Sequence, residues 1–173
     1  MSLILLRHTR PEGAEGRCYG RTDLPLAGCF AGEVARLIDE LPPVARIVSS
    51  PLSRCRLLAE AIGSARGLPV EIEPGLIEVD FGRWENRAWD DLPRAELDAW
   101  AADFFAAKPH GGESVNDLAT RTRSTLDRLS EGARPLLAVT HSGIVRATMA
   151  LAGDPKGWGF DLGFGRWHAI DWP

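Results

Sequence analysis

The stretch Leu3-Ile4-Leu5-Leu6-Arg7-His8-Thr9 decides how the fold of this chain is interpreted. Its first four residues form a continuous apolar run, and Pro11 and Gly13 follow closely behind. A short apolar run bounded by turn-forming residues is typical of a buried strand in a parallel sheet. The run therefore predicts a first strand that ends beside Arg7 and His8, at the sheet edge where open α/β sheets bind ligands.

The whole chain has the composition of one globular domain. It has 173 residues, of which 45% are hydrophobic and 25% are charged, and its net charge is -4. This length is enough for a hydrophobic core, and the lack of a basic excess argues against a nucleic acid partner. No apolar stretch is long enough to span a membrane, and no signal peptide is recognisable. Three cysteines without a CxxC spacing indicate a reduced, cytoplasmic protein, and the oligomeric state stays open.

Strand and helix patterns alternate along the rest of the chain. Strands are predicted at 46–49, 70–73, 136–140 and 167–172, and helices at 26–41, 52–65, 114–129 and 143–151. This alternation predicts an α/β fold, a three-layer Rossmann-like sandwich whose mostly parallel sheet carries helices on both faces. The segment 84–109 is rich in Trp, Asp and Ala. We interpret it as a cap-like insertion over one end of the sheet, within a single domain of residues 1–173.

A second histidine occupies a position like that of His8. His141 follows the strand predicted at 136–140, and Gly143 opens the next helix. Because the carboxyl ends of parallel strands meet at one edge, His8 and His141 are expected at the same edge, beside a helix N-terminus that favours anions. The alternative is that each histidine is packed into the core and serves structure alone.

An arginine follows the second predicted strand in a similar way. Arg54 ends the segment Ser49-Ser50-Pro51-Leu52-Ser53-Arg54 and lies in the first turn of a predicted helix. A positive charge at the positive end of the helix dipole is unfavourable unless an anion binds there. Arg54 is therefore a candidate anion ligand, and a solvated surface arginine is the alternative.

Three carboxylates compete for the role of an acid. Glu78 stands between Ile77 and Val79, and partial desolvation by such neighbours raises a carboxyl pKa and suits it to general acid catalysis. By chemistry alone, Asp80 and Glu85 remain rivals. The sequence also contains His110 before two glycines, and we interpret it as a loop residue.

In their order and spacing, these motifs and the segment Gly111-Gly112-Glu113-Ser114 resemble the histidine phosphatase superfamily, the phosphoglycerate mutase-like group of enzymes. The resemblance covers nearly the whole chain and implies a metal-independent phosphatase with a three-layer fold. It implies a nucleophile at His8, a phosphate pocket of Arg7, Arg54 and a charged His141, and a proton donor at Glu78. No cofactor is implied. The histidines are too scattered to form a metal-ligand cluster, and the two arginines already supply positive charge.

The chain departs from the family pattern in ways that keep the catalytic groups. Thr9 and Ser142 stand where the family often has glycine after each histidine, and both hydroxyls are candidate contacts to the phosphate or the leaving group. Leu58 replaces a common threonine, and Asn86 replaces a common glycine.

A narrower resemblance lies in segment 16–26, which contains Cys18-Tyr19-Gly20 and is similar to alpha-ribazole phosphatases. Those enzymes remove the 5'-phosphate of α-ribazole phosphate in cobalamin synthesis. Tyr19, Trp84 and Trp89 are expected to form an aromatic wall that would stack on a planar base. The sequence leaves several alternatives open: a broad-specificity phosphatase, a phosphoglycerate mutase, a phosphatase of protein phosphohistidine, and a non-catalytic phosphate-binding protein. In each enzyme case the partner is a phosphate-bearing substrate.

Overall fold

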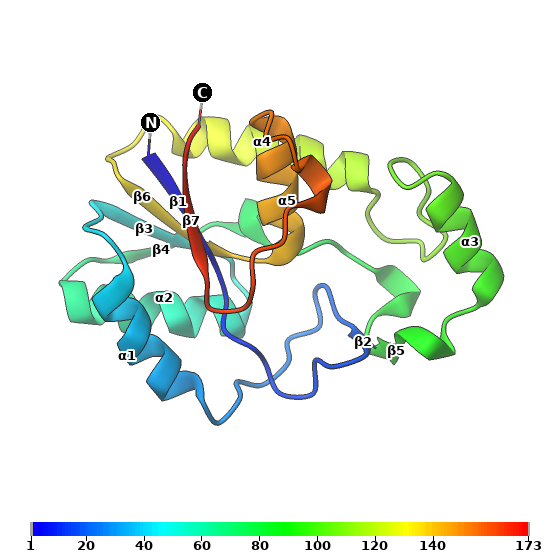
Figure 1. The fold of residues 1–173 in the computed structure, drawn as a ribbon, viewed down its shortest axis with the longest axis horizontal. Coiled ribbons are helices and arrows are strands. Elements are labelled where there is room, and N and C mark those ends of the chain that lie inside the picture. The colour runs from blue at the N-terminus through cyan, green and yellow to red at the C-terminus, as the bar shows by residue number, and fades with distance from the viewer. Residues whose placement is uncertain (1, 173) are drawn as a thin grey trace.

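A five-stranded sheet forms the centre of the computed structural model, which describes residues 2–172 (Figure 1). The strand order is β4-β3-β6-β1-β7. The parallel strands are β1 (Ser2–Arg7), β3 (Arg46–Ser49), β4 (Val70–Ile72) and β6 (Leu136–Thr140), and β7 (Trp167–Asp171) pairs with β1 in the antiparallel sense. The predicted α/β fold with a mostly parallel sheet is confirmed.

Helices cover both faces of this sheet. On one side lie α1 (Phe30–Glu40) and α2 (Ser53–Arg66), and on the other lie α4 (Val115–Leu129) and α5 (Ser142–Leu151) (Figure 1). In β1, Ile4 and Leu6 belong to the core under α1 and α2, whereas Leu3 and Leu5 belong to the core under α4 and α5. Both faces of the strand are therefore buried, which is why its sequence is continuously apolar.

The helix boundaries differ slightly from the predicted ones. The helix expected from Leu26 begins at Phe30, because Leu26 itself pairs with Pro11 in an isolated antiparallel bridge. The helix expected from Ser114 begins at Val115, because Ser114 is its N-cap and forms a capping box with Asp117.

The insertion contributes no strand to the central sheet within the described residues. It contains β5 (Arg87–Ala88), the 3-10 turn η3 (Trp89–Asp91) and α3 (Arg94–Ala102). β5 pairs with β2 (Arg17–Cys18), and Figure 1 shows this part beside one end of the sheet. Further 3-10 turns are η1 (Pro74–Leu76), η2 (Gly82–Trp84) and η4 (Gly157–Gly159). Among residues 2–172, no helix is both long and apolar enough to cross a bilayer.

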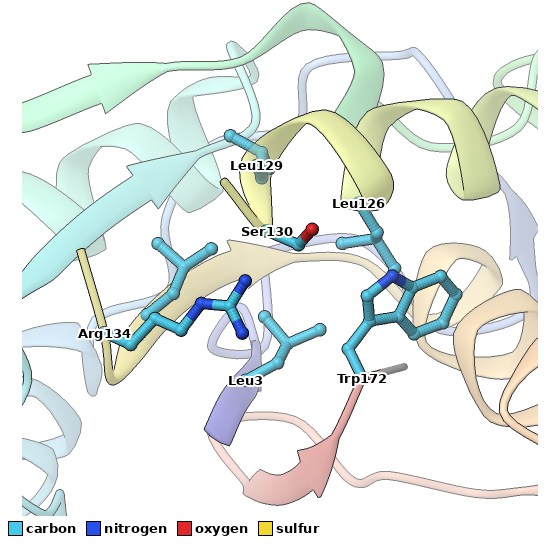
Figure 2. A pocket seen from close by; sticks show the side chains of 7 residues that line it. Leu3, Leu126, Leu129, Ser130, Arg134 and Trp172 are labelled. Atoms are coloured by element: carbon cyan, nitrogen blue, oxygen red, sulfur yellow. The ribbon is translucent and has the colours of Figure 1, made fainter. Parts of the chain in front are cut away.

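A small cavity lies at the amino-terminal ends of β1 and β6, away from His8 and His141 (Figure 2). It is lined by Leu3, Leu126, Leu129, Ser130, Arg134, Leu136 and Trp172. Its volume of about 10 Å³ is no more than one water molecule needs. We therefore regard it as a packing gap and not as a ligand site.

Candidate active site

His8 and His141 lie side by side at the carboxyl edge of the sheet. β1 and β6 are neighbours, and Arg7 pairs with Thr140 in their register. The next residue on each strand is therefore a histidine, and the backbone N–H of His8 donates to the Thr140 carbonyl at 3.0 Å. The two imidazole centroids are 5.1 Å apart, and both side chains are buried. The structure thus brings together two histidines that are far apart in the sequence.

The tautomer of His8 leaves one nitrogen free to react. Its Nδ1 lies 2.7 Å from the carbonyl oxygen of Thr9, which can only accept, so Nδ1 carries the proton and Nε2 carries the lone pair. Burial, followed by the charge of Arg54, lowers the pKa of His8 to about 3. The imidazole is therefore neutral near pH 7, as a nucleophile must be.

Arg54 is fully buried against this nucleophile. Its Nε donates to His8 Nε2 at 3.3 Å. The other two nitrogens donate to backbone carbonyls, Nη1 to Thr22 at 2.7 Å and Nη2 to Gly20 at 2.6 Å. Loop 20–22 therefore holds the guanidinium in one orientation, in the first turn of α2.

Glu85 in turn holds loop 20–22 in place. Its carboxylate accepts backbone N–H groups from Gly20, Arg21 and Thr22 at 2.9–3.2 Å, and one from Phe81 at 3.1 Å. It also accepts the hydroxyl of Thr22. Burial acts to raise the pKa of Glu85, but these hydrogen bonds together hold it below its ordinary value. Glu85 is therefore an ionised structural carboxylate and a poor proton donor.

Asp80 is also committed to local structure. Its Oδ1 accepts from the backbone N–H of Gly82 at 2.7 Å, and its Oδ2 lies 3.3 Å from a guanidinium nitrogen of Arg21. It does not line the cavity that contains His8. Asp80 is thus the weaker candidate for the acid on position alone.

Glu78 has the surroundings that an acid needs. It is buried, lines the same cavity as His8, and burial raises its pKa. Its Oε1 accepts from the backbone N–H of Val79 at 3.0 Å, and its Oε2 accepts from that of Gly143 at 3.1 Å. A Cβ at position 143 would lie 2.2 Å from Oε1, so this approach requires glycine. Of the three carboxylates, the geometry favours Glu78.

His141 lies behind His8 and is fully buried. Its Nε2 is 2.7 Å from Ser50 Oγ and 3.4 Å from Cys55 Sγ. Burial, and then the neighbouring His8 and Arg54, lower the pKa of His141 well below its ordinary value. Burial therefore favours the neutral imidazole, and a positive charge on His141 when a phosphoryl group is bound stays a prediction.

Arg7 is held beside the nucleophile by two contacts. Its Nη1 donates to the Leu162 carbonyl at 2.8 Å, and its guanidinium lies 3.8 Å from the ring centroid of Phe164. Its Nε is buried and has no hydrogen-bond partner among the described residues. Arg7 also lines the same cavity as His8.

The remaining candidate residues differ in how they meet the cavity. Tyr19 and Ser142 line it. Thr9 does not, and its buried hydroxyl has no partner within residues 2–172, so a substrate contact by that hydroxyl stays a prediction. The established contact of Thr9 is its backbone carbonyl, which sets the tautomer of His8.

The cavity extends from the histidines into the insertion and has a volume of about 430 Å³. Arg7, His8 and Glu78 line it, while Arg54 and His141 are fully buried next to His8 and do not line it. The aromatic lining consists of Tyr19, Phe81, Trp89, Trp100, Phe104, Trp158 and His110. The predicted phosphate ligand Arg7 and the predicted nucleophile His8 therefore share one cavity with an aromatic wall.

The aromatic wall differs from the predicted one at Trp84. This side chain is fully buried, and its Nε1 donates to the Glu96 carboxylate at 2.6 Å, so it forms the core of the insertion and does not face the cavity. Sequence reasoning expected Trp100 to help cover the cleft and took His110 for a loop residue, but it missed Phe104 and Trp158. The density of aromatic residues in 84–109 could have indicated Phe104, whereas nothing in the sequence singled out Trp158.

Potential metal ligands are dispersed. Within residues 2–172, no group of three or more His, Cys, Asp or Glu side chains is arranged to hold a metal ion. Positive charge at the site comes instead from the guanidinium groups of Arg7 and Arg54.

Comparison with known proteins agrees with this arrangement. Residues 3–169 match the histidine phosphatase superfamily (branch 1). The adenosylcobalamin/alpha-ribazole phosphatase of Escherichia coli strain K12 is 32% identical over 182 residues, covering 99% of this chain and 90% of that protein. A glucosyl-3-phosphoglycerate phosphatase of Mycolicibacterium vanbaalenii is 34% identical over 171 residues, covering 88% of this chain and 75% of that protein. The crystal structure of the alpha-ribazole phosphatase of Shigella flexneri superimposes with a TM-score of 0.87 at 32% identity, covering 99% of this chain and 90% of that one. This chain belongs to the histidine phosphatase superfamily.

Proposed function

We propose that this protein hydrolyses a small-molecule phosphomonoester through a phosphohistidine at His8, and that α-ribazole 5'-phosphate is its substrate. The protein is a phosphatase of the histidine phosphatase superfamily. The observation that carries the mechanism is the neutral, oriented His8, which accepts a hydrogen bond from Arg54 and lines the same cavity as the carboxyl group of Glu78.

In the first step, Nε2 of His8 attacks phosphorus and the bond from phosphorus to the ester oxygen breaks. Arg54 transfers its Nε hydrogen bond from His8 to a phosphoryl oxygen, and the guanidinium of Arg7, which lines the same cavity, contributes a further donor. Glu78 gives its proton to the departing oxygen, so the product leaves as a neutral alcohol. Nδ1–H of His8 keeps its bond to Thr9 and stabilises the phosphorylated ring.

In the second step, a water molecule attacks the phosphohistidine and the phosphorus–nitrogen bond breaks. The carboxylate of Glu78 takes the proton of the water and returns to its acid form. Inorganic phosphate leaves, and His8 regains its lone pair. Two easier displacements thus replace one difficult one. His141, which is held by Ser50 and whose ring centroid lies 5.1 Å from that of His8, contacts the phosphoryl group bound to His8.

The aromatic lining of the cavity supports a substrate with a planar ring. Trp89 and Trp100 have nearly parallel rings with an interplanar angle of 14°. Tyr19 lines the same cavity, and its ring centroid lies 5.3 Å from the Arg54 guanidinium carbon. Aromatic pairs contribute about 0.5–1.5 kcal/mol beyond burial. The benzimidazole of α-ribazole can use this wall, whereas phosphoglycerate has no ring to place there.

The test of the substrate is kcat/KM for α-ribazole 5'-phosphate, 3-phosphoglycerate and a simple sugar phosphate. We expect a preference of about tenfold or more for the ribazole, and Trp89→Leu should reduce that preference more than it reduces the rate with the sugar phosphate. Comparable values for all three substrates would indicate a generalist phosphatase. Isomerisation of phosphoglycerate faster than its hydrolysis would indicate a mutase.

A further inference from the structure

His110 occupies a fixed position in the wall of the cavity. Its side chain is only 2% exposed, and its ring centroid lies 4.8 Å from that of Trp84 and 5.8 Å from that of Phe81. Its backbone carbonyl accepts from the N–H of Arg83 at 3.0 Å. The ring is therefore held from the insertion side and from its own backbone, unlike an ordinary loop histidine.

One tautomer of His110 follows from its surroundings. Nδ1 accepts a hydrogen bond from the backbone N–H of Gly112 at 3.0 Å, so it carries no proton. Burial lowers the pKa of His110, and the ring is therefore neutral near pH 7 with its single proton on Nε2. Within residues 2–172, no side chain or carbonyl accepts a hydrogen bond from Nε2–H. Nε2 is also absent from the completely buried polar atoms that lack a partner, and His110 lines the cavity. The ring offers an unused hydrogen-bond donor.

The loop that carries His110 is fixed by close packing. A Cβ at Gly112 would lie 2.1 Å from the carbonyl oxygen of Asp80, and the backbone N–H of Glu113 donates to the same oxygen at 2.9 Å. A Cβ at Gly82 would likewise lie 2.3 Å from the His110 carbonyl oxygen. The donor is therefore organised before a substrate arrives, which reduces the entropy lost on binding.

We propose that His110 determines specificity for the leaving group, because its Nε2–H donates to an acceptor atom, such as an unprotonated ring nitrogen, on a planar ring that lies in the cavity. This inference rests on the proposed function and deepens it. The aromatic side chains Phe81, Trp89 and Trp100 supply stacking area but distinguish poorly between rings of one shape. A buried donor rejects an analogue that lacks the acceptor, because the donor then stays unpaired.

A pair of isosteric substrates tests this inference with the unmodified enzyme. Benzimidazole riboside 5'-phosphate has an acceptor nitrogen in its ring, and indole riboside 5'-phosphate has a C–H at the same place. Both rings are planar and of nearly equal size, so stacking is matched. We expect kcat/KM to be about ten- to a hundredfold higher for the benzimidazole compound.

Two variants of His110 locate the donor. His110→Asn places an amide oxygen near the position of Nδ1, where it can accept from Gly112, but it has no donor at the position of Nε2. His110→Gln carries an amide nitrogen to that position. We expect the ratio of the two kcat/KM values to fall toward one in the Asn variant and to be partly retained in the Gln variant. Thermal unfolding of each variant checks that the fold survives.

The outcomes separate this inference from the proposed function. Equal kcat/KM values for the two ribosides in the unmodified enzyme, both well above that for a sugar phosphate, would overturn the role of His110 and leave the preference for planar rings intact. A ratio that stays the same in the Asn variant would also overturn it. If the enzyme hydrolyses the sugar phosphate rapidly and kcat/KM for both ribosides is very low, the proposed substrate class is rejected, and the donor role of His110 is rejected with it.

Discussion

Arg54 donates from Nε to the lone pair of His8 Nε2 at a distance of 3.3 Å. The buried positive charge helps to keep His8 unprotonated, since protonation would place two cations in contact. The same Nε–H is directed at the position where phosphorus would bond to His8. After burial, which lowers the pKa of His8 most, this contact contributes to the neutral state of His8, and in the proposed mechanism it also neutralises the phosphoryl group.

Replacing His8 should stop turnover. We expect His8→Ala to lower kcat by about a thousandfold or more, because the covalent route is lost. A brief reaction with labelled substrate, quenched without acid, should place the phosphoryl group on His8 in the unmodified protein. Label on His141 would reverse the two roles, and full activity of His8→Ala would reject the mechanism.

Replacing Glu78 should affect substrates according to their leaving groups. Glu78→Gln has no proton to give, so kcat/KM for alkyl phosphates should fall by about 10²–10⁴-fold. The loss with nitrophenyl phosphate should be about tenfold or less, because nitrophenolate leaves without protonation. Asp80→Asn is the matched control and should show no such dependence on the leaving group. Equal losses on both substrates would argue against an acid role for Glu78.

The pH profile should carry the signature of the same carboxyl group. Burial raises the pKa of Glu78, and the acid form is the active one, so kcat/KM for an alkyl phosphate should decline as the pH rises through that raised pKa. His8, with a pKa of about 3, stays neutral throughout this range and does not contribute to the decline. A profile measured with nitrophenyl phosphate should fall less steeply on the alkaline side. A decline of equal size with both substrates would assign it to another group.

Glu85 should act on catalysis through Arg54. Glu85→Gln offers fewer acceptors to the N–H groups of loop 20–22, so we expect a loss of about 1–3 kcal/mol in unfolding free energy. Because the carbonyls of Gly20 and Thr22 orient Arg54, kcat/KM should also fall by about tenfold or more. Glu60→Gln, in an exposed ion pair with Arg56, is the control, with an expected change within about 0.5 kcal/mol. If kcat/KM of Glu85→Gln is unaltered, loop 20–22 does not influence catalysis through Arg54.

Activity should not depend on a divalent metal. Arg7 and Arg54 provide the positive charge that metal ions supply in many phosphoryl-transfer sites. We expect the full rate to persist in excess chelator. A strict requirement for added Mg²⁺ or Zn²⁺ would mean that the two arginines do not suffice.

Much of the fold could be predicted from local patterns. The apolar run before Arg7 and the run before His141 both form parallel strands, because a strand that is buried on both faces needs apolar residues at every position. The shared edge of the two histidines followed from the parallel arrangement alone. The sequence did not predict that β1 and β6 are immediate neighbours in the sheet. Strand order depends on how the helices pack on the two faces of the sheet.

What the sequence by itself determined is the α/β architecture and the set of residue types that meet at its carboxyl edge. The tertiary structure supplies the physical reason for preferring Glu78, which the resemblance had implied as the acid: Glu78 is buried in the cavity that His8 lines, whereas Glu85 accepts hydrogen bonds from loop 20–22. It also decided that Trp89 faces the cavity while Trp84 is buried, and that His110 faces the same cavity. The physical reason is common to all of these residues. Protonation state and accessibility are set by neighbours that are distant in the sequence, and a local pattern contains no information about which neighbours those are.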